Sequence, residues 1–426
     1  MDRTTPRTSV EAQPWSATHS VAASSTSRIL YVSAPAPVPS KIGPARRNFH
    51  ILEQLTRFFD VSVLALGSDA DADLFARAFG NVPSRFIAPR PGPRRKFARK
   101  VWRTVRNQCD FVPTLEPRFR RACVELMQLE SFDAIVLSCV LLRDLPLPVD
   151  IPIIADTHNV EFDVLRRTAV SADSWVRRQY AQRQFRATLQ EEQRSASSVD
   201  LLLATSDRDE LVFRKELAIS NTAVVPNGVD LSEFTAAKRP GEPGVILFSG
   251  LMSYYPNQQA VRWFLDHVFP LVLRQVPTAT FVVAGAAPPR WLLDRANPKV
   301  RVTGLVPDMR PFLEQASVFV APLRIAGGTR VKILEAQATG RPVVSTSAGA
   351  EGLDAADGES ILIADDANTF ADHVVRALTD ERLGAHLASK GLSHVMRHHD
   401  WNQIGEHLSG LLQTRAGLVP RHDAAE

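Results

Sequence analysis

Short apolar runs alternate with longer segments that have helical spacing along most of the chain. In the first half the runs cover residues 28–33, 61–66, 133–138, 151–156 and 201–206. Apolar runs of this length, bounded by polar turns, predict strands that are buried on both faces. Between them, apolar residues recur every three or four positions and predict helices, including a long one over residues 171–196. This alternation predicts a doubly wound parallel sheet in a domain over residues 28–235.

The same pattern restarts after segment 236–244, a predicted linker rich in Lys, Pro and Gly. Runs 245–250 and 280–285 each end in Gly, and run 300–304 repeats the arrangement more weakly. These runs predict a second sheet, in a domain over residues 245–400, whose ligand lies along the edge where the strands end.

The two ends of the chain differ from this pattern. Residues 1–27 are rich in Ser, Thr, Ala and Pro and predict a disordered tail. Residues 401–426 contain Trp401 and are expected to form a helix that returns to the first domain, followed by a short tail.

A glycine-rich segment follows the apolar run 317–323 and carries the strongest chemical signal. Gly327 and Gly328 allow a close approach of the backbone to a ligand, and Thr329 is expected to cap the next helix. Arg330 and Lys332 add two cations at that helix end, where the helix dipole disfavours positive charge. A bound phosphate would remove the conflict, so the segment predicts an anion site.

The helix after this loop is expected to end at Gly340 in a left-handed conformation. Glu335 falls at the border of its buried face, where a carboxylate needs a partner. Two interpretations remain open at this stage. Glu335 forms a salt bridge with Arg330 or Lys332, or it accepts hydrogen bonds from paired hydroxyls of a ligand such as a ribose.

Two candidate sites follow strands of the first domain. His158 comes directly after a predicted strand with acidic and amide neighbours, and its near-neutral pKa would let it donate or accept a proton at pH 7. Gly43 ends a Pro-rich loop after the first strand and is a candidate ligand contact, although a plain turn explains a single Gly equally well. The motif 225–230 contains Asn-Gly and predicts a turn.

A basic segment begins at Arg94 and ends at Arg106. It holds seven Lys or Arg and no acid, with Phe97 and Trp102 on the apolar side of a predicted helix. One interpretation is a surface helix packed on its own domain; the other is contact with an anionic membrane or an acidic lipid-linked acceptor. Aromatic residues are too few there to favour nucleic-acid binding.

The composition is that of a soluble protein with two or three domains, since 426 residues are 45% hydrophobic and 23% charged. The formal charge of +4 does not indicate general binding of nucleic acid. Cys109, Cys123 and Cys139 have no zinc-site spacing and fit a reducing cytoplasm. No segment has the length and apolarity of a membrane span.

Taken in order, several motifs resemble the retaining glycosyltransferases of family 4. They are Val225-Pro226-Asn227-Gly228, Phe248-Ser249-Gly250, Pro256-Asn257, Gly304-Leu305-Val306, Gly328-Thr329-Arg330-Val331-Lys332, Glu335-Ala336 and Gly340-Arg341-Pro342. The likeness covers about residues 28–410 and is greatest to a branch involved in bacterial polysaccharide assembly. It implies the GT-B fold, an α/β architecture in which two Rossmann-like doubly wound domains face a cleft.

The resemblance also implies roles for individual residues. Glu335 would take the ribose hydroxyls, the loop from Gly327 to Lys332 would hold the diphosphate and sugar, and Val306 would lie near the base. Ser249, Gly250 and Asn257 would line the donor site, and His158 would lie near the reacting sugar. The family often has a glutamate where this chain has Gly327, and an Arg-Lys pair that is absent from residues 249–257; Arg330 and Lys332 are expected to replace the pair's charge.

The expected activity is therefore transfer of a sugar from a nucleoside diphosphate to an acceptor hydroxyl, without a metal or other cofactor. The acceptor is expected to be lipid-linked or a growing polysaccharide, at the inner face of the plasma membrane. A non-catalytic protein that binds sugar nucleotides and a sugar-nucleotide epimerase of the same fold are the alternatives.

Overall fold

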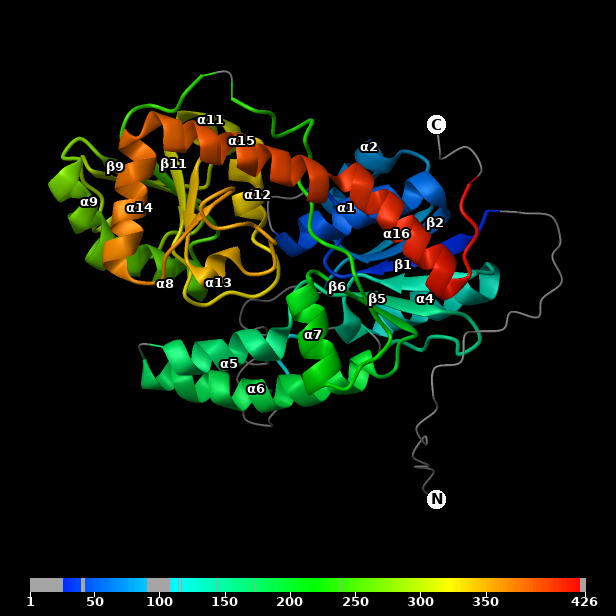
Figure 1. Ribbon diagram of the computed structural model, residues 1–426. Helices are drawn as coiled ribbons and strands as arrows, with labels where there is room; N and C mark the ends of the chain where they lie inside the picture. Colours follow the sequence, from blue (N-terminus) through cyan, green and yellow to red (C-terminus); the bar gives the residue numbers. More distant parts are fainter. Residues whose placement is uncertain are drawn as a thin grey trace.

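The computed structural model of the protein describes residues 26–39, 43–89, 108–113, 115, 117–142, 144–172, 174–237 and 239–421. These residues form two α/β domains that lie side by side, each built on one parallel sheet (Figure 1). The predicted pair of doubly wound parallel sheets is confirmed.

The first domain contains a seven-stranded sheet in the order β3-β2-β1-β4-β5-β6-β7. Its strands are β1 Arg28–Ser33, β2 Asp60–Leu66, β3 Ser84–Ile87, β4 Ala134–Leu137, β5 Ile153–Asp156, β6 Leu201–Ala204 and β7 Thr222–Val224. Its helices are α1 Gly43–Phe58, α2 Asp69–Phe79, α4 Pro117–Leu129, the 3-10 turn η1 Val140–Leu142, α5 Glu161–Ser171, α6 Trp175–Ala196 and α7 Asp207–Glu216.

The second domain contains a six-stranded sheet in the order β10-β9-β8-β11-β12-β13. Its strands are β8 Val245–Ser249, β9 Thr280–Ala284, β10 Val300–Gly304, β11 Val318–Ala321, β12 Val343–Ser345 and β13 Leu362–Ile363. The helices that follow β8 and β9 are α8 Tyr255–Trp263, the π-helical turn η2 Phe264–Val268, α9 Phe269–Gln275 and α10 Arg290–Leu293. Those after β10 are α11 Arg310–Gln315, α12 Val331–Ala338, α13 Ser347–Ala350, α14 Ala367–Thr379, α15 Glu381–His398 and α16 Trp401–Ala416.

Each sheet is buried on both faces, which explains why its strands are continuously apolar. Along β1, Ile29 and Tyr31 pack in one core cluster while Leu30 and Val32 pack in another. The alternation of side chains along a strand sends neighbours to opposite faces, so a strand between two cores has no polar face. The second sheet repeats this, with Phe248 in one cluster and Leu247 in the other.

The long helix expected over residues 171–196 is α6, which begins four residues later than expected, at Trp175, and ends at Ala196. Helix α5 ends at Ser171 and α6 begins at Trp175, so the chain reverses and the two helices form a hairpin. The hairpin extends from the first domain along the second (Figure 1), where Arg167 pairs with Glu351.

The chain crosses between the domains at residues 225–231 and again at 398–401, and the two crossings are hydrogen-bonded to each other. The Val229 amide donates to the His399 carbonyl over 2.8 Å, and Nδ1 of His399 donates to the Asn227 carbonyl over 2.8 Å. After the second crossing, α16 packs on the core of the first domain (Figure 1).

The predicted Asn-Gly turn is wrong. Gly228 does not adopt a positive φ. Instead, a Cβ at this position would lie 2.8 Å from the Trp401 ring, so glycine is required for close packing of the two crossings.

Two predictions concern residues outside the described ranges. The basic segment 94–106 is one, and residues 1–25 of the predicted tail are the other. Ser27, at the end of that tail, is described, and its amide donates to the Val419 carbonyl over 2.8 Å.

Candidate active site

The carboxyl ends of the strands in the second sheet carry most of the predicted site residues. Ser249 ends β8 and is buried, and Gly250 follows with φ +156°. A Cβ at Gly250 would lie 2.7 Å from Lys332 Nζ, which itself donates to Asn257 Oδ1 over 2.9 Å. The structure therefore brings Gly250, Asn257 and Lys332 together, as the predicted donor site requires.

Arg330 is a buried cation with no ion pair among the described residues. Its Nη1 donates to the Gly327 carbonyl over 2.9 Å and its Nη2 to the Glu351 carbonyl over 3.0 Å, while Nε has no partner. Burial lowers the pKa of Arg330 to about 10. A buried guanidinium held only by carbonyl groups retains most of its affinity for an anion.

Lys332 lies two residues beyond Arg330, in the first turn of α12. Burial, followed by the charge of Arg330, lowers the pKa of Lys332 to about 7. Its ammonium also lies 4.4 Å from the centre of the Phe248 ring. The positive charges of Arg330 and Lys332 repel each other, and burial deprives both of water. A bound anion would stabilise both charges, as expected at a phosphate site.

The helix beside these cations begins later than the sequence predicted. Arg330, not Thr329, is the residue before α12, and no side chain caps the helix. The Thr329 hydroxyl instead donates to the Thr205 carbonyl of the first domain over 3.1 Å. Among the described residues, α12 therefore has no N-cap side chain that accepts from its first amides, while Thr329 joins the two domains.

Gly327 and Gly328 also contact the first domain. A Cβ at Gly327 would overlap Val164, and one at Gly328, where φ is +63°, would overlap the His158 carbonyl and the Asn159 side chain. The close approach that the glycines permit is thus an approach to the opposite domain. A side chain at position 327 would have to displace Val164.

His158 lies at the carboxyl end of β5, as predicted, but its predicted pKa is wrong. Burial lowers the pKa of His158 to about 4, so the ring is neutral at pH 7. Its Nε2 lies 2.7 Å from Asn48 Oδ1, and the Asn48 amide nitrogen donates to Ser33 and Pro35. Nε2 of His158 is therefore the donor, and Nδ1 keeps a lone pair that can accept a hydrogen bond.

Glu335 pairs with Arg46 of α1, and not with Arg330 or Lys332 as one interpretation predicted. Arg46 also contacts Glu233 over 3.3 Å and lies 5.1 Å from the centre of the Phe234 ring. Burial raises the pKa of Glu335, and the Arg46 charge opposes that increase. Sequence reasoning missed Arg46, whose only signal was its place in a helix that follows a strand end.

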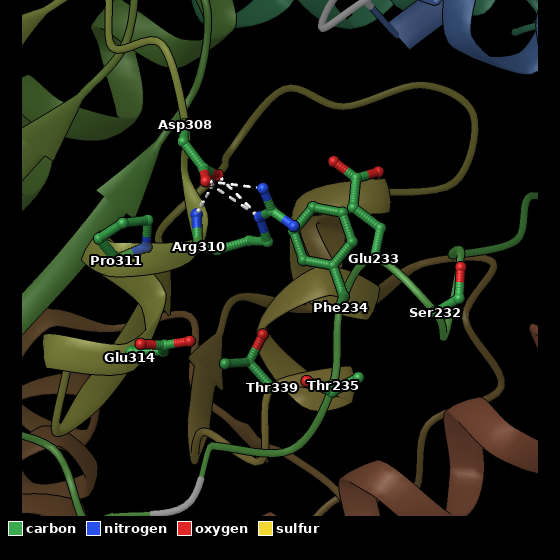
Figure 2. A pocket seen from close by; sticks show the side chains of 9 residues that line it. All are labelled: Ser232, Glu233, Phe234, Thr235, Asp308, Arg310, Pro311, Glu314 and Thr339. Atoms are coloured by element: carbon green, nitrogen blue, oxygen red, sulfur yellow. Dashed lines mark hydrogen bonds and ion pairs between the residues drawn. The ribbon is translucent and has the colours of Figure 1, made fainter.

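A pocket of about 300 Å³ lies beside this ion pair, next to the linker (Figure 2). Its lining residues are Ser232, Glu233, Phe234, Thr235, Asp308, Arg310, Pro311, Glu314 and Thr339. Thr339 is one turn beyond Glu335 on α12, and its hydroxyl donates to the Glu335 carbonyl over 2.7 Å. Val306 is buried in the loop between β10 and α11, which also contains Asp308, and Arg310 is the first residue of α11.

Gly43 is the first residue of α1, and the loop before it at 40–42 lies outside the described residues. Three residues further along α1, Arg46 reaches Glu335. The amino end of α1 therefore borders the predicted donor site.

Among the described residues, no group of three or more His, Cys, Asp or Glu is arranged to hold a metal ion. None of the described helices combines the length and hydropathy that crossing a membrane requires.

Comparison with known proteins agrees with this geometry. Residues 243–380 match the family model described as Glycosyl transferases group 1, which covers the whole loop from Gly327 to Lys332 and Glu335. Over 91% of its length the chain also superimposes on 98% of a sucrose-phosphate synthase from Thermosynechococcus elongatus, with a TM-score of 0.69 at 17% identity. The chain therefore has the GT-B fold, and its residues 243–380 are similar to the group 1 glycosyltransferases.

A second solved relative of this GT-B protein has a sugar nucleotide in its structure. HepE of Anabaena in complex with UDP-glucose has a TM-score of 0.65 and 15% identity, over 91% of this chain and 99% of that one. Likeness at this identity establishes the shared fold and leaves the substrates of this chain to be proposed.

Curated relatives of this GT-B protein match only part of it. An uncharacterized 44.6 kDa protein in the cps region of Klebsiella pneumoniae is 24% identical over 37% of this chain and 43% of its own length. A phosphatidyl-myo-inositol mannosyltransferase of Mycolicibacterium smegmatis is 25% identical over 48% of this chain and 55% of its own. The matched region thus spans about half the length of these relatives.

Proposed function

We propose that this protein transfers a sugar from a nucleoside diphosphate sugar to an acceptor hydroxyl, with retention of the anomeric configuration. The pairing of Arg330 with Lys332 beside Glu335 is the observation that carries the proposal. The leaving group of such a reaction is a diphosphate, and preorganised cations stabilise the charge that develops on it. Because these two side chains supply that charge, the proposal includes no metal and no other cofactor.

The other site residues have complementary parts in this proposal. In this proposal Arg46 gives up its ion pair with Glu335 and keeps the one with Glu233, so that Glu335 can accept hydrogen bonds from the two ribose hydroxyls. The base then lies near Val306, toward the pocket in Figure 2. His158 accepts a hydrogen bond from a sugar hydroxyl at Nδ1. A neutral ring suits this role, since a charged imidazolium would repel the neighbouring cations.

The acceptor in this proposal is a lipid-linked saccharide or a growing polysaccharide at the cytoplasmic face of the plasma membrane. Two relatives support it, since one is a protein of a cps region and another is a phosphatidyl-myo-inositol mannosyltransferase. The basic segment 94–106 would add a contact with anionic lipid.

The direct test is release of nucleoside diphosphate from a panel of UDP-, GDP- and ADP-sugars in the presence of bacterial lipid extract. We expect release from one donor, dependent on the extract, that falls in Glu335→Ala because the ribose hydroxyls lose their acceptor. Nuclear magnetic resonance of the first-formed product then reports whether its anomeric configuration is that of the donor. A product of inverted configuration would remove retention from the proposal and leave transfer intact.

A second function, non-catalytic binding of sugar nucleotides, is favoured by one observation. The space beside Gly327 is filled by Val164, so no carboxylate from this position reaches the donor sugar while the domains are in contact. Measurable nucleotide binding without release from any donor in the panel would favour this second function.

Nucleotide binding is also expected to take up protons, because Lys332 titrates near neutrality in the free protein. With a pKa of about 7, Lys332 is about half protonated at pH 7. A bound diphosphate favours the charged form and raises this pKa, so uptake should be small at pH 6 and approach about one proton at pH 8. Calorimetry in buffers of different ionisation enthalpy measures it.

The matched control for this prediction is Lys332→Arg, whose guanidinium stays charged over this whole pH range. It should bind nucleoside diphosphate without the uptake at pH 8. Equal uptake by the two proteins would show that another group takes the proton.

A further inference from the structure

A second pocket, of about 140 Å³, lies between the α5–α6 hairpin of the first domain and α8 of the second. Ser174, Arg177, Tyr255, Gln258, Gln259 and Arg262 line it. It is too small for a whole sugar nucleotide and would hold about five waters at the volume of the liquid. None of its lining residues belongs to the donor site described above.

Two guanidinium groups of the pocket are available to a ligand. Arg177 lies 3.9 Å from the centre of the Tyr255 ring, and Arg262 lies 4.5 Å from the centre of the Trp291 ring. Stacking fixes the plane of a guanidinium and leaves its N–H edge free for planar anions. Within the described part of the chain, neither arginine forms a salt bridge.

Two helix ends meet at the same place. Helix α6 begins next to Ser174 and α8 begins at Tyr255, and neither start has a side-chain cap. Among the described residues, neither N-cap side chain accepts a hydrogen bond from its helix, and both helix dipoles favour negative charge at this place.

Gln259 provides an independent sign of a ligand. This pocket residue is only 7% exposed, and its Oε1 has no hydrogen-bond partner among the described residues. A buried acceptor without a donor is unfavourable, and a ligand hydroxyl would satisfy it. The pocket therefore suits a molecule that carries both an anionic group and a hydroxyl.

We propose that this pocket is an acceptor subsite, in which Arg177 and Arg262 bind a phosphate or carboxylate of the acceptor and Gln259 binds a neighbouring hydroxyl. The subsite lies across the domain boundary, on the α8 side of the loop that follows β8. This inference rests on the proposed transfer reaction and specifies the class of its acceptor.

The test measures binding to the full chain with the donor site saturated by whichever nucleoside diphosphate binds, so that Arg330 and Lys332 are occupied. The probes are glycerol 1-phosphate, glucuronate and neutral glucose. We expect one anionic probe to bind and glucose not to bind. Phosphate selectivity would indicate a phosphate-bearing acceptor, and glucuronate selectivity an acidic saccharide.

Arg177→Gln and Arg262→Gln should each weaken binding of the anionic probe by about tenfold or more, since each removes a charged hydrogen bond. Arg183→Gln is the matched control, because Arg183 is exposed on the same helix and does not line the pocket. Gln259→Leu should abolish the preference for glycerol 1-phosphate or glucuronate over inorganic phosphate or acetate.

Unchanged binding of the anionic probe in the Arg177→Gln/Arg262→Gln double variant would overturn the proposal, as would equal binding of glucose. Absence of binding by all three probes at millimolar concentration would also overturn it. A failure of sugar transfer is a separate result, because these measurements contain no donor sugar and require no turnover.

Discussion

Replacing Lys332 by alanine should lower turnover by about 100- to 1,000-fold, the usual cost of losing one preorganised donor to a developing negative charge. Lys332 is held at Asn257 Oδ1 over 2.9 Å and stands at the amino end of α12, where the departing diphosphate is proposed to lie. The measurement is the rate of nucleoside diphosphate release from the donor that the wild type uses, at saturating donor and acceptor.

Two controls define this result. Lys390→Ala removes an exposed lysine on α15 and should leave the rate unchanged. Lys332→Arg keeps the charge but places a larger, planar group beside Gly250 and Asn257, so we expect partial activity. Near-normal turnover of Lys332→Ala would contradict the role given to this lysine, and Arg330 would then be the main stabiliser of the leaving group.

The fold was predictable because its strands are buried on both faces. Continuously apolar runs such as 245–249 and 280–284 are typical of strands inside a parallel sheet that is covered on both faces. In the structure these two runs form β8 and β9. The sequence did not predict the short edge strands β3, β7 and β13. An edge strand is exposed on one side and too short to show a period, so its sequence resembles that of a loop.

The candidate site was only partly predictable, because its contacts cross between domains. The ion pair between Arg46 and Glu335 joins residues 289 positions apart, and no pattern in either segment indicates the other. Helical spacing favoured Arg330 or Lys332 as the partner of Glu335, because all three residues were expected within two turns of the same helix. In the structure, Arg330 is directed to carbonyl groups and Lys332 to Asn257.

The contact of the Gly327 loop with the other domain was also not predictable from the local sequence. Its glycines correctly indicated a close approach, but glycine has no side chain to specify what approaches it. The partner is the loop after β5, which was itself predicted as a site because His158 follows a strand end. Sequence reasoning therefore found both halves of the candidate site, and the structure shows that they touch.

The largest expected effect on stability is that of Arg47→Met in the first domain. Arg47 is 2% exposed and uses all five of its N–H donors. Two go to the fully buried Asp156 carboxylate over 2.8 and 2.7 Å, and the others reach the first crossing between the domains, at the Val225 and Pro226 carbonyls and the Asn227 side chain. Removing the guanidinium leaves a buried, unpaired carboxylate and should cost about 3–5 kcal/mol of unfolding free energy.

Hydrogen exchange measures this loss within one domain and does not require a single unfolding transition for the whole chain. Amides of β1 and β5 that exchange only on global opening should exchange roughly 100- to 5,000-fold faster in Arg47→Met. Arg290→Met is the control, because its ion pair with Asp294 is exposed and worth about 0.5 kcal/mol or less. The double variant Arg47→Met/Asp156→Asn should recover part of the loss, since an amide is cheaper to bury unpaired than a carboxylate. If the double variant is no more protected than Arg47→Met, the stabilisation resides instead in the bonds from Arg47 to residues 225–227, and this guanidinium acts chiefly to hold the first crossing between the two domains.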